Sequence, residues 1–185
     1  MARTPSNMLP LGTKAPQFKL FDTVSGQTLA LESLKGKQGT VIMFICNHCP
    51  FVVHVNEELV AMANEYSSKG IGFIAISSND TENYPQDAPE KMTSHAQENN
   101  YPFPYLYDES QAIAKAYDAA CTPDLYLFNQ DLKLVYRGQL DSSRPGNGIP
   151  VTGEDLRNAL NCLLLGKENT KTQKPSIGCN IKWKN

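Results

Sequence analysis

Two cysteines separated by two residues, in the sequence Cys46-Asn-His-Cys49, are the side chains with the clearest potential for chemistry. At this spacing two thiols can form a disulfide, and a thiolate can exchange with the disulfide of another molecule. The spacing alone arises easily by chance, so its meaning depends on where the pair lies in the fold. His48, between the two cysteines, can add positive charge that lowers the pKa of a thiol.

The segments around the pair predict a strand followed by a helix. Residues 40–45 form a short, partly β-branched apolar run, which is typical of a strand buried on both faces. A helical pattern follows and ends at Gly70. Together with a second apolar run at 71–76, this order predicts a strand–helix–strand unit with two parallel strands. The apolar positions of the helix are Val52, Val55, Leu59, Met62 and Tyr66.

This placement puts the pair at the N-terminal end of a helix, where unpaired amides and the helix dipole favour a thiolate. We expect Cys46, at the tip, to be the exposed and reactive thiol with a lowered pKa. Cys49, about one turn further on, is expected to be more buried. Two other interpretations stay open, a structural pair of buried thiols and a zinc site that adds His48 and Cys121.

The rest of the chain predicts one domain, 1–166, followed by a basic tail, 167–185. The tail contains five lysines and one glutamate, whereas the preceding residues are acidic in balance, and its Trp183 favours docking on the domain. The further predicted elements are a hairpin within 15–31, a helix over 89–99, a strand over 103–107, a helix capped by Ser110, a hairpin of 125–128 with 132–136, and a helix capped by 152–155 that ends at Gly166.

Composition excludes several classes of protein. Hydrophobic residues make up 41% and charged residues 19% of the 185 residues, as in globular proteins. The net charge of −2 gives no field that attracts nucleic acid or acidic membranes. No apolar run is long enough to cross a bilayer, and the N-terminus lacks the apolar segment of a signal peptide. We therefore expect a soluble, cytoplasmic protein with no nucleic-acid or membrane partner. Five cysteines are too few for a secreted disulfide scaffold.

Six further motifs lie at 15–20, 34–37, 44–50, 121–124, 136–146 and 175–184. Together they resemble the thioredoxin superfamily, and within it a peroxiredoxin-like subgroup of the alkyl hydroperoxide reductase/thiol-specific antioxidant branch. The resemblance implies a thioredoxin-like α/β fold, with a central mixed β-sheet flanked by helices, an N-terminal β-hairpin extension and the C-terminal tail. It also implies that Pro123 is cis, packs opposite the cysteine pair and frames the substrate groove together with Thr122.

The chain also departs from these relatives. Peroxiredoxins carry the pattern Pro-x-x-x-Thr/Ser-x-x-Cys, but the hydroxyl position is Cys46 when counted from Cys49, and Met43 when counted from Cys46. We therefore expect weak peroxidase chemistry. A histidine directly before the second cysteine occurs in strongly oxidising members, so the resemblance implies a pair that is more oxidising than that of thioredoxin.

These observations predict a thiol–disulfide oxidoreductase that needs no cofactor or metal. Cys46 would exchange with the substrate disulfide, Cys49 would resolve the mixed disulfide, and His48 would tune the thiolate. The partners would be a protein or small-molecule thiol or disulfide and a reductant. Two alternatives are a peroxiredoxin-like thiol peroxidase that uses Cys46, and a copper- or zinc-delivery protein that uses Cys46, Cys49 and a histidine.

Two further cysteines are candidate auxiliary thiols. Cys121 begins the turn that contains Pro123, and Cys179 can reach the pair if the tail docks. One additional disulfide, between Cys121 and Cys179, would then fit. Cys162 is expected to be a half-buried thiol packed beside leucines of the last helix.

For two histidines and two arginines we expect a structural role rather than a functional one. His54 and His95 are expected to be solvated. Arg137 and Arg144 are expected to be solvated or paired with Asp141, with binding of an anionic substrate as the alternative.

Overall fold

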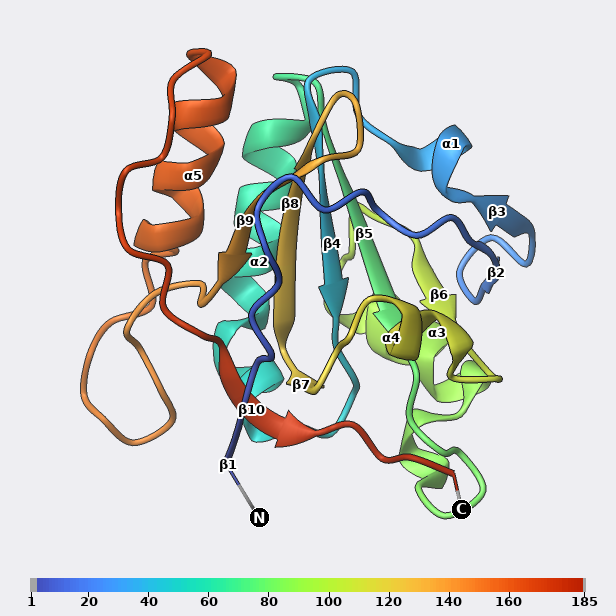
Figure 1. The fold of residues 1–185 in the computed structure, drawn as a ribbon. Helices are drawn as coiled ribbons and strands as arrows, with labels where there is room; N and C mark the ends of the chain where they lie inside the picture. The colour runs from blue at the N-terminus through green and yellow to red at the C-terminus, as the bar shows by residue number, and fades with distance from the viewer. Residues whose placement is uncertain (1–2, 185) are drawn as a thin grey trace.

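Within residues 3–184, the computed structural model contains ten strands, five α-helices and one short 3-10 helix (Figure 1). The strands are β1 (Arg3–Pro5), β2 (Lys19–Asp22), β3 (Thr28–Ala30), β4 (Gly39–Phe44), β5 (Ile71–Ser77), β6 (Tyr105–Tyr107), β7 (Cys121–Thr122), β8 (Asp124–Asn129), β9 (Leu134–Gly138) and β10 (Ile177–Asn180). The helices are α1 (Leu31–Leu34), α2 (Pro50–Ser67), α3 (Pro89–Glu98), α4 (Ala112–Ala116), α5 (Glu154–Leu164) and the 3-10 helix η1 (Pro85–Asp87).

The strand that leads into the cysteine pair, β4, lies in the interior of a seven-stranded sheet. The strand order is β3-β2-β6-β5-β4-β8-β9. β4 pairs in parallel with β5 and antiparallel with β8, so the sheet is mixed. All six residues of β4 are buried, which explains why its sequence is apolar without alternation. The predicted strand–helix–strand unit and the thioredoxin-like α/β fold are confirmed.

Helices cover both faces of this sheet. α2, α3 and α5 pack on the face that includes Val41 and Met43, whereas α1 and α4 pack on the face that includes Ile42 and Phe44. The alternation follows from the two-residue period of a strand, which points successive side chains to opposite faces. None of the helices within residues 3–184 combines the length and the apolar character needed to cross a membrane.

The predicted hairpins are confirmed, but two helix starts differ from expectation. The N-terminal hairpin is β2 with β3, and the later one is β8 with β9. α4 begins at Ala112, and the carboxylate of Asp108 accepts hydrogen bonds from the amides of its first turns, at 2.9 Å from Ala114 N. Ser110 accepts a single 3.3 Å hydrogen bond from Ala112 N, whereas Asp108 accepts from the next two amides, those of Ile113 and Ala114. α5 begins after Gly153, which has a left-handed backbone, φ 67°, and no capping side chain.

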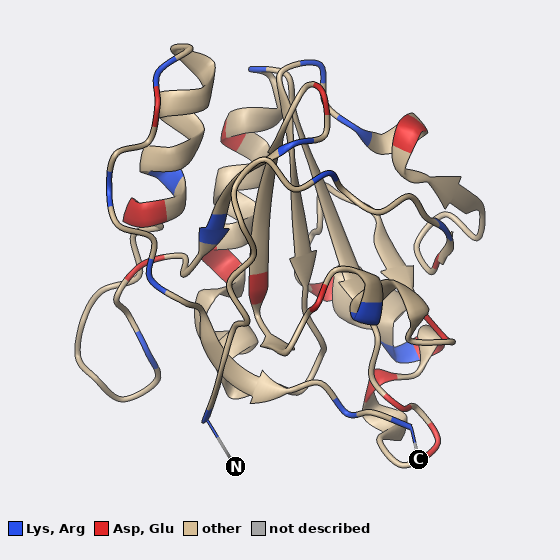
Figure 2. Cartoon of the chain, viewed as in Figure 1, with Lys and Arg blue, Asp and Glu red and all other residues tan. Residues whose placement is uncertain are grey.

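The C-terminal tail contributes a strand to a second, three-stranded sheet of order β1-β10-β7. β10 lies between β1 and β7 and crosses the end of the molecule where β7 and the N-terminus of α2 also lie (Figure 1). The basic residues after β10 lie beside the acidic segment that contains Asp80 (Figure 2), and Asp80 N donates to the carbonyl of Lys182 at 2.8 Å. The tail is therefore held by backbone pairing on both of its edges.

Gly178, in β10, lies directly against the segment that precedes Pro123. A Cβ atom at position 178 would overlap the backbone carbonyl of Thr122. Only a glycine allows β10 to approach this closely, because backbone cannot yield as a flexible side chain can.

We expect Gly178→Ala to destabilise the docked tail by about 1–3 kcal/mol, the usual effect of forcing a methyl group into a packed site. Limited trypsin digestion would measure this, since Lys167 and Lys171 precede β10. Thr172→Ala, at an exposed position of the same tail, is the control. Equal protease resistance of the two variants would contradict the prediction.

Candidate functional site

The two cysteines lie between the end of β4 and the start of α2. Cys49 is the N-cap of α2, and Pro50 is its first residue, so Cys49 rather than Cys46 lies at the helix tip. Cys46 is 1% exposed and Cys49 is 0% exposed. The expectation of an exposed Cys46 is therefore wrong, because groups from distant segments of the chain, Thr122 and Asp87, contact the loop before the helix.

Thr122 contacts both sulfur atoms. Its Oγ1 lies 3.5 Å from Cys46 Sγ, and its backbone carbonyl accepts a hydrogen bond from Cys49 Sγ at 3.1 Å. The peptide bond between Thr122 and Pro123 is cis, as the resemblance implied. Cys46 and Cys49 are also hydrogen-bonded to each other. The site is thus a pair of thiols in mutual contact beneath the turn that contains Pro123.

The thiolate of the reduced pair is favoured on Cys49. The pKa of Cys49 is lowered to about 4, first by the hydrogen bond from Cys46 and then by hydrogen bonds from Cys179. The same bond to Cys49, burial and the charge of Asp87 raise the pKa of Cys46. Burial opposes ionisation of Cys49, whereas a hydrogen bond from the Thr122 side chain and the position at a helix N-terminus favour it. The expected lowering at Cys46 is wrong in direction.

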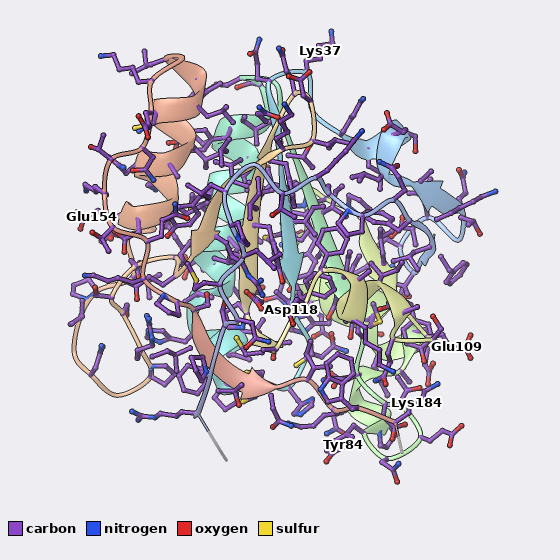
Figure 3. All side chains as sticks on the ribbon, viewed as in Figure 1. Lys37, Tyr84, Glu109, Asp118, Glu154 and Lys184 are labelled. Atoms are coloured by element: carbon purple, nitrogen blue, oxygen red, sulfur yellow. The ribbon has the colours of Figure 1, made fainter. Side chains whose placement is uncertain are left out.

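His48 pairs with a carboxylate that the sequence analysis missed. His48 Nδ1 lies 2.8 Å from Oδ2 of Asp87, which is 0% exposed. Asp87 also accepts hydrogen bonds from Asn47 N at 2.9 Å and Asn79 Nδ2 at 2.8 Å. The His48 ring stacks on Tyr84, which lies at the same end of the molecule as Lys184 (Figure 3). No sequence signal marks Asp87, because it lies 40 residues from Asn47, at the end of the short polar 3-10 helix η1.

Three of these groups could hold a metal ion. One ligand atom each from Cys46, His48 and Asp87 lie within 4.8 Å of one another, and within residues 3–184 they form the one such group of three or more. Sulfur, imidazole and carboxylate ligands together suit zinc. Cys121, which the sequence suggested as a ligand, does not belong to this group.

Cys179 lies beside Cys49. Both its thiol and its backbone amide hydrogen-bond the Cys49 sulfur. The register of β10 and β7 pairs Cys179 with Thr122, and Asn180 with Cys121. Because adjacent residues of a strand point to opposite faces, Cys121 and Cys179 lie on opposite faces of this ladder. The predicted Cys121–Cys179 disulfide does not fit this register. The Cys121 thiol instead donates to the carbonyl of Pro123 at 3.6 Å, and burial raises its pKa.

The remaining singled-out residues have structural partners. His54 Nε2 lies 2.7 Å from Ser143 Oγ, and His95 is half-buried with its pKa lowered by burial, so the expectation of solvated histidines is wrong. Cys162 is half-buried, as expected. Arg144 donates to the carbonyl of Asp141 at 2.7 Å.

Arg137 is fully buried, in contrast to the expected solvated loop arginine. Its Nη2 atom lies 3.1 Å from Asp124 Oδ2 and donates to the carbonyl of Asp118 at 2.7 Å. Its guanidinium also lies 4.5 Å from the centre of the Tyr126 ring. The pair of Arg137 and Asp124 therefore supports the residue that follows Pro123, rather than an anionic substrate.

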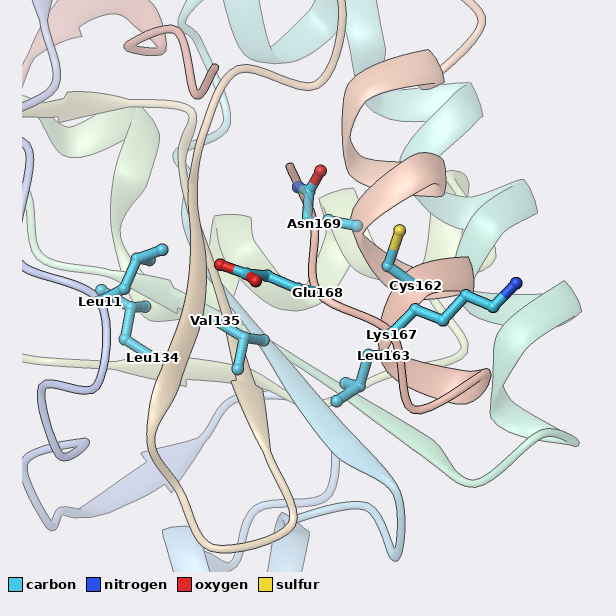
Figure 4. A pocket seen from close by; sticks show the side chains of 9 residues that line it. Leu11, Leu134, Val135, Cys162, Leu163, Lys167, Glu168 and Asn169 are labelled. Atoms are coloured by element: carbon cyan, nitrogen blue, oxygen red, sulfur yellow. The ribbon is translucent and has the colours of Figure 1, made fainter. Parts of the chain in front are cut away.

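A separate apolar cavity of about 170 Å³ lies between β9 and the C-terminal half of α5 (Figure 4). The end of α5 that borders it lies opposite the end of the molecule that holds the N-terminus of α2 (Figure 1). Its labelled lining residues are Leu11, Leu134, Val135, Cys162, Leu163, Lys167, Glu168 and Asn169.

Comparisons with known proteins support the fold described above. The model of the Redoxin family matches residues 10–159. A crystal structure of an uncharacterized conserved protein from Geobacillus kaustophilus is 62% identical, with a TM-score of 0.98, and the match covers 100% of this chain and 97% of that one. A hypothetical protein from Sinorhizobium meliloti 1021 is 46% identical, with a TM-score of 0.95 and 98% of both chains covered.

A more distant structure shares the fold. The thioredoxin domain of a thiol-disulfide oxidoreductase from Bacteroides vulgatus is 18% identical, with a TM-score of 0.66, and the match covers 85% of this chain and 99% of that one. None of the curated proteins compared with this chain matches it.

The lowered pKa of Cys49 predicts a thiolate in the reduced protein far below the ordinary cysteine pKa of about 8.5. On acidification, the ultraviolet thiolate absorbance should persist until the pH approaches about 4. Cys49→Ser should remove this signal, and Cys46→Ala should move the midpoint upward, because Cys46 provides the largest stabilising hydrogen bond. Cys162→Ser is the matched control. A midpoint that does not change without Cys46 would contradict the assignment.

Proposed function

Because the chain belongs to the Redoxin family, we propose that it is a thiol–disulfide oxidoreductase that works through Cys46 and Cys49. The observation that carries the proposal is the hydrogen bond between these two thiols, at the N-terminus of α2 and beneath the cis Thr122–Pro123 peptide. Thiols in contact can pass between the dithiol and the disulfide with little movement of the backbone. The partners are then a thiol or disulfide substrate and a thiol reductant.

The surroundings of the two sulfurs favour Cys46 as the one that meets the substrate. Cys46 adjoins His48, whose side chain is 24% exposed, whereas Cys49 is enclosed by Thr122 and Cys179. Cys46 passes its proton along the hydrogen bond to Cys49 and attacks one sulfur of the substrate disulfide, and the other substrate sulfur leaves as a thiolate. Cys49 then passes its proton to that thiolate and attacks Cys46. The Cys46–Cys49 disulfide forms and the second substrate thiol is released.

Peroxidase activity is less well supported by the same contacts. The Thr122 hydroxyl lies 3.5 Å from Cys46 Sγ, although the sequence has no hydroxyl at the position that peroxiredoxins use. A peroxide also needs a positive group at its leaving oxygen. Arg137 is engaged by Asp124 and Asp118, and Arg144 by the carbonyl of Asp141. Disulfide exchange requires neither arginine.

A second candidate function, metal binding, is favoured by the group of Cys46, His48 and Asp87. Its ligand types suit zinc, with a fourth position open for water or another thiol. Metal bound there would occupy the sulfur that disulfide exchange needs, so the two functions compete for Cys46.

Replacing either cysteine should stop dithiol turnover. We expect Cys46→Ser and Cys49→Ser each to slow the reduction of insulin disulfides by on the order of 100-fold or more, because the second, intramolecular step is lost. Cys49→Ser should accumulate a mixed disulfide on Cys46, detectable by mass spectrometry. Cys162→Ser should keep wild-type rates. Full activity in both single variants would refute the proposed function.

Zinc titration separates the second candidate from the first. If the group binds zinc, Asp87→Asn and His48→Ala should each weaken binding by about 10-fold or more, as loss of a ligand does. His95→Ala, outside the group, should bind as the wild type does. Equal zinc affinity in all four proteins, measured by calorimetry, would exclude this site.

A further inference from the structure

The C-terminal tail brings a third thiol to the cysteine pair. Cys179 is 2% exposed and lies in β10, which pairs with both β1 and β7. Its thiol and its amide both hydrogen-bond the sulfur of Cys49. Cys49 therefore contacts one thiol from its own loop, Cys46, and one from the tail, Cys179.

The other two cysteines do not share this arrangement. Cys121 lies on the opposite face of the β7–β10 ladder, with its thiol directed to the carbonyl of Pro123. Cys162 belongs to α5 and borders the separate apolar cavity. A thiol that already contacts the Cys49 sulfur needs only a short movement to reach the bonded S–S distance of about 2.05 Å.

The geometry points to Cys179 as a third redox thiol. It can replace Cys46 as the disulfide partner of Cys49. This inference rests on the proposed function, which supplies the Cys46–Cys49 disulfide from which the exchange begins. Cys49 is the shared member, so the oxidised protein holds one of two disulfides, Cys46–Cys49 or Cys49–Cys179, and never both.

The exchange balances without any added oxidant or reductant. Cys179 loses its proton and attacks the Cys49 sulfur of the Cys46–Cys49 disulfide. The Cys49–Cys179 bond forms, the Cys46–Cys49 bond breaks, and Cys46 leaves as a thiolate that takes up the proton. One disulfide is present before and after, so no net oxidation occurs. The oxidising equivalents pass from Cys46, which meets the substrate, to the tail.

This step has two structural consequences. Cys46 returns to its reduced state next to Thr122, whereas Cys49 stays oxidised until the Cys49–Cys179 disulfide is reduced. The tail, previously held by hydrogen bonds along β10, becomes covalently attached to the N-terminus of α2. The redox state of the site and the docking of the tail are therefore linked.

Removing Cys46 isolates the proposed bond. Cys46→Ala is oxidised with diamide, alkylated and digested with trypsin without reduction. Trypsin leaves Cys46 and Cys49 in one peptide, 38–69, but separates Cys121, Cys162 and Cys179 into three others. In this variant any link to 38–69 therefore involves Cys49. We expect the 38–69 peptide joined to the peptide that contains Cys179. Alkylated Cys179, or a link from 38–69 to Cys121 or Cys162, overturns the inference.

Further variants identify the sulfur that bonds to Cys49. Cys46→Ser, which keeps the volume and a donor for Cys49, replaces Cys46→Ala if circular dichroism shows that the alanine variant is unfolded. The double variant Cys46→Ala/Cys179→Ser should lose the linked peptide, and Cys46→Ala/Cys162→Ser should keep it. Persistence of a link to 38–69 without Cys179, or its loss without Cys162, would contradict the proposal.

The test is separate from that of the proposed function. Cys179→Ser keeps Cys46 and Cys49, so it should still form their disulfide when treated with oxidised glutathione. If it does so while Cys46→Ala leaves Cys179 alkylated, the third thiol is refuted and the oxidoreductase stands. If Cys179→Ser forms no Cys46–Cys49 disulfide, the proposed function fails whatever happens at Cys179 in the Cys46→Ala variant.

Discussion

The position of Thr122 is the constraint on which the rest of the site depends. Its hydroxyl lies 3.5 Å from Cys46 Sγ, and its carbonyl accepts from Cys49 at 3.1 Å. The same residue pairs with Cys179 across the ladder of β7 and β10, and Gly178 packs on its carbonyl. A small displacement of Thr122 would change the surroundings of the Cys46, Cys49 and Cys179 sulfurs together, because these contacts are closely packed. The buried pair of Arg137 and Asp124 is well placed to limit such a displacement, since Asp124 follows Pro123 directly.

Asp87 connects the tail to the cysteine pair by a second route. The carboxylate accepts from Asn47 N and from Asn79 Nδ2, and Asn79 Oδ1 accepts from the amide of Lys182 at 2.9 Å. A buried carboxylate is costly unless hydrogen bonds satisfy it, and here the donors come from two separate segments. The same charge raises the pKa of Cys46. Asp87 thus holds the loop that contains Asn47 and also opposes ionisation of Cys46. The thiolate is therefore favoured on Cys49.

The sequence predicted those features that depend on local periodicity. The apolar run at 40–45 and the helical pattern after Cys49 correctly located the pair between β4 and α2, and the resemblance implied the cis peptide before Pro123. The position of the thiolate could not be predicted in this way. It depends on Asp87 and Cys179, which lie far along the chain and meet the pair only in the folded protein. Likewise, the faces on which Cys121 and Cys179 lie depend on the register of two short strands, and a shift of one residue would exchange them.

Docking of the tail and pairing of an extended peptide with β7 would exclude each other. β7 is a two-residue strand, and its edge is already paired with β10. An extended peptide that added itself to that edge would need to displace β10, since each backbone group of the edge makes its hydrogen bond only once. Removing β10 would also take the Cys179 donors away from Cys49, whose pKa they help to lower. The state in which a peptide can reach β7 is therefore a state in which the Cys49 thiolate is less stabilised. A docked tail stabilises the Cys49 thiolate, and an undocked tail leaves the edge of β7 free to pair with a peptide.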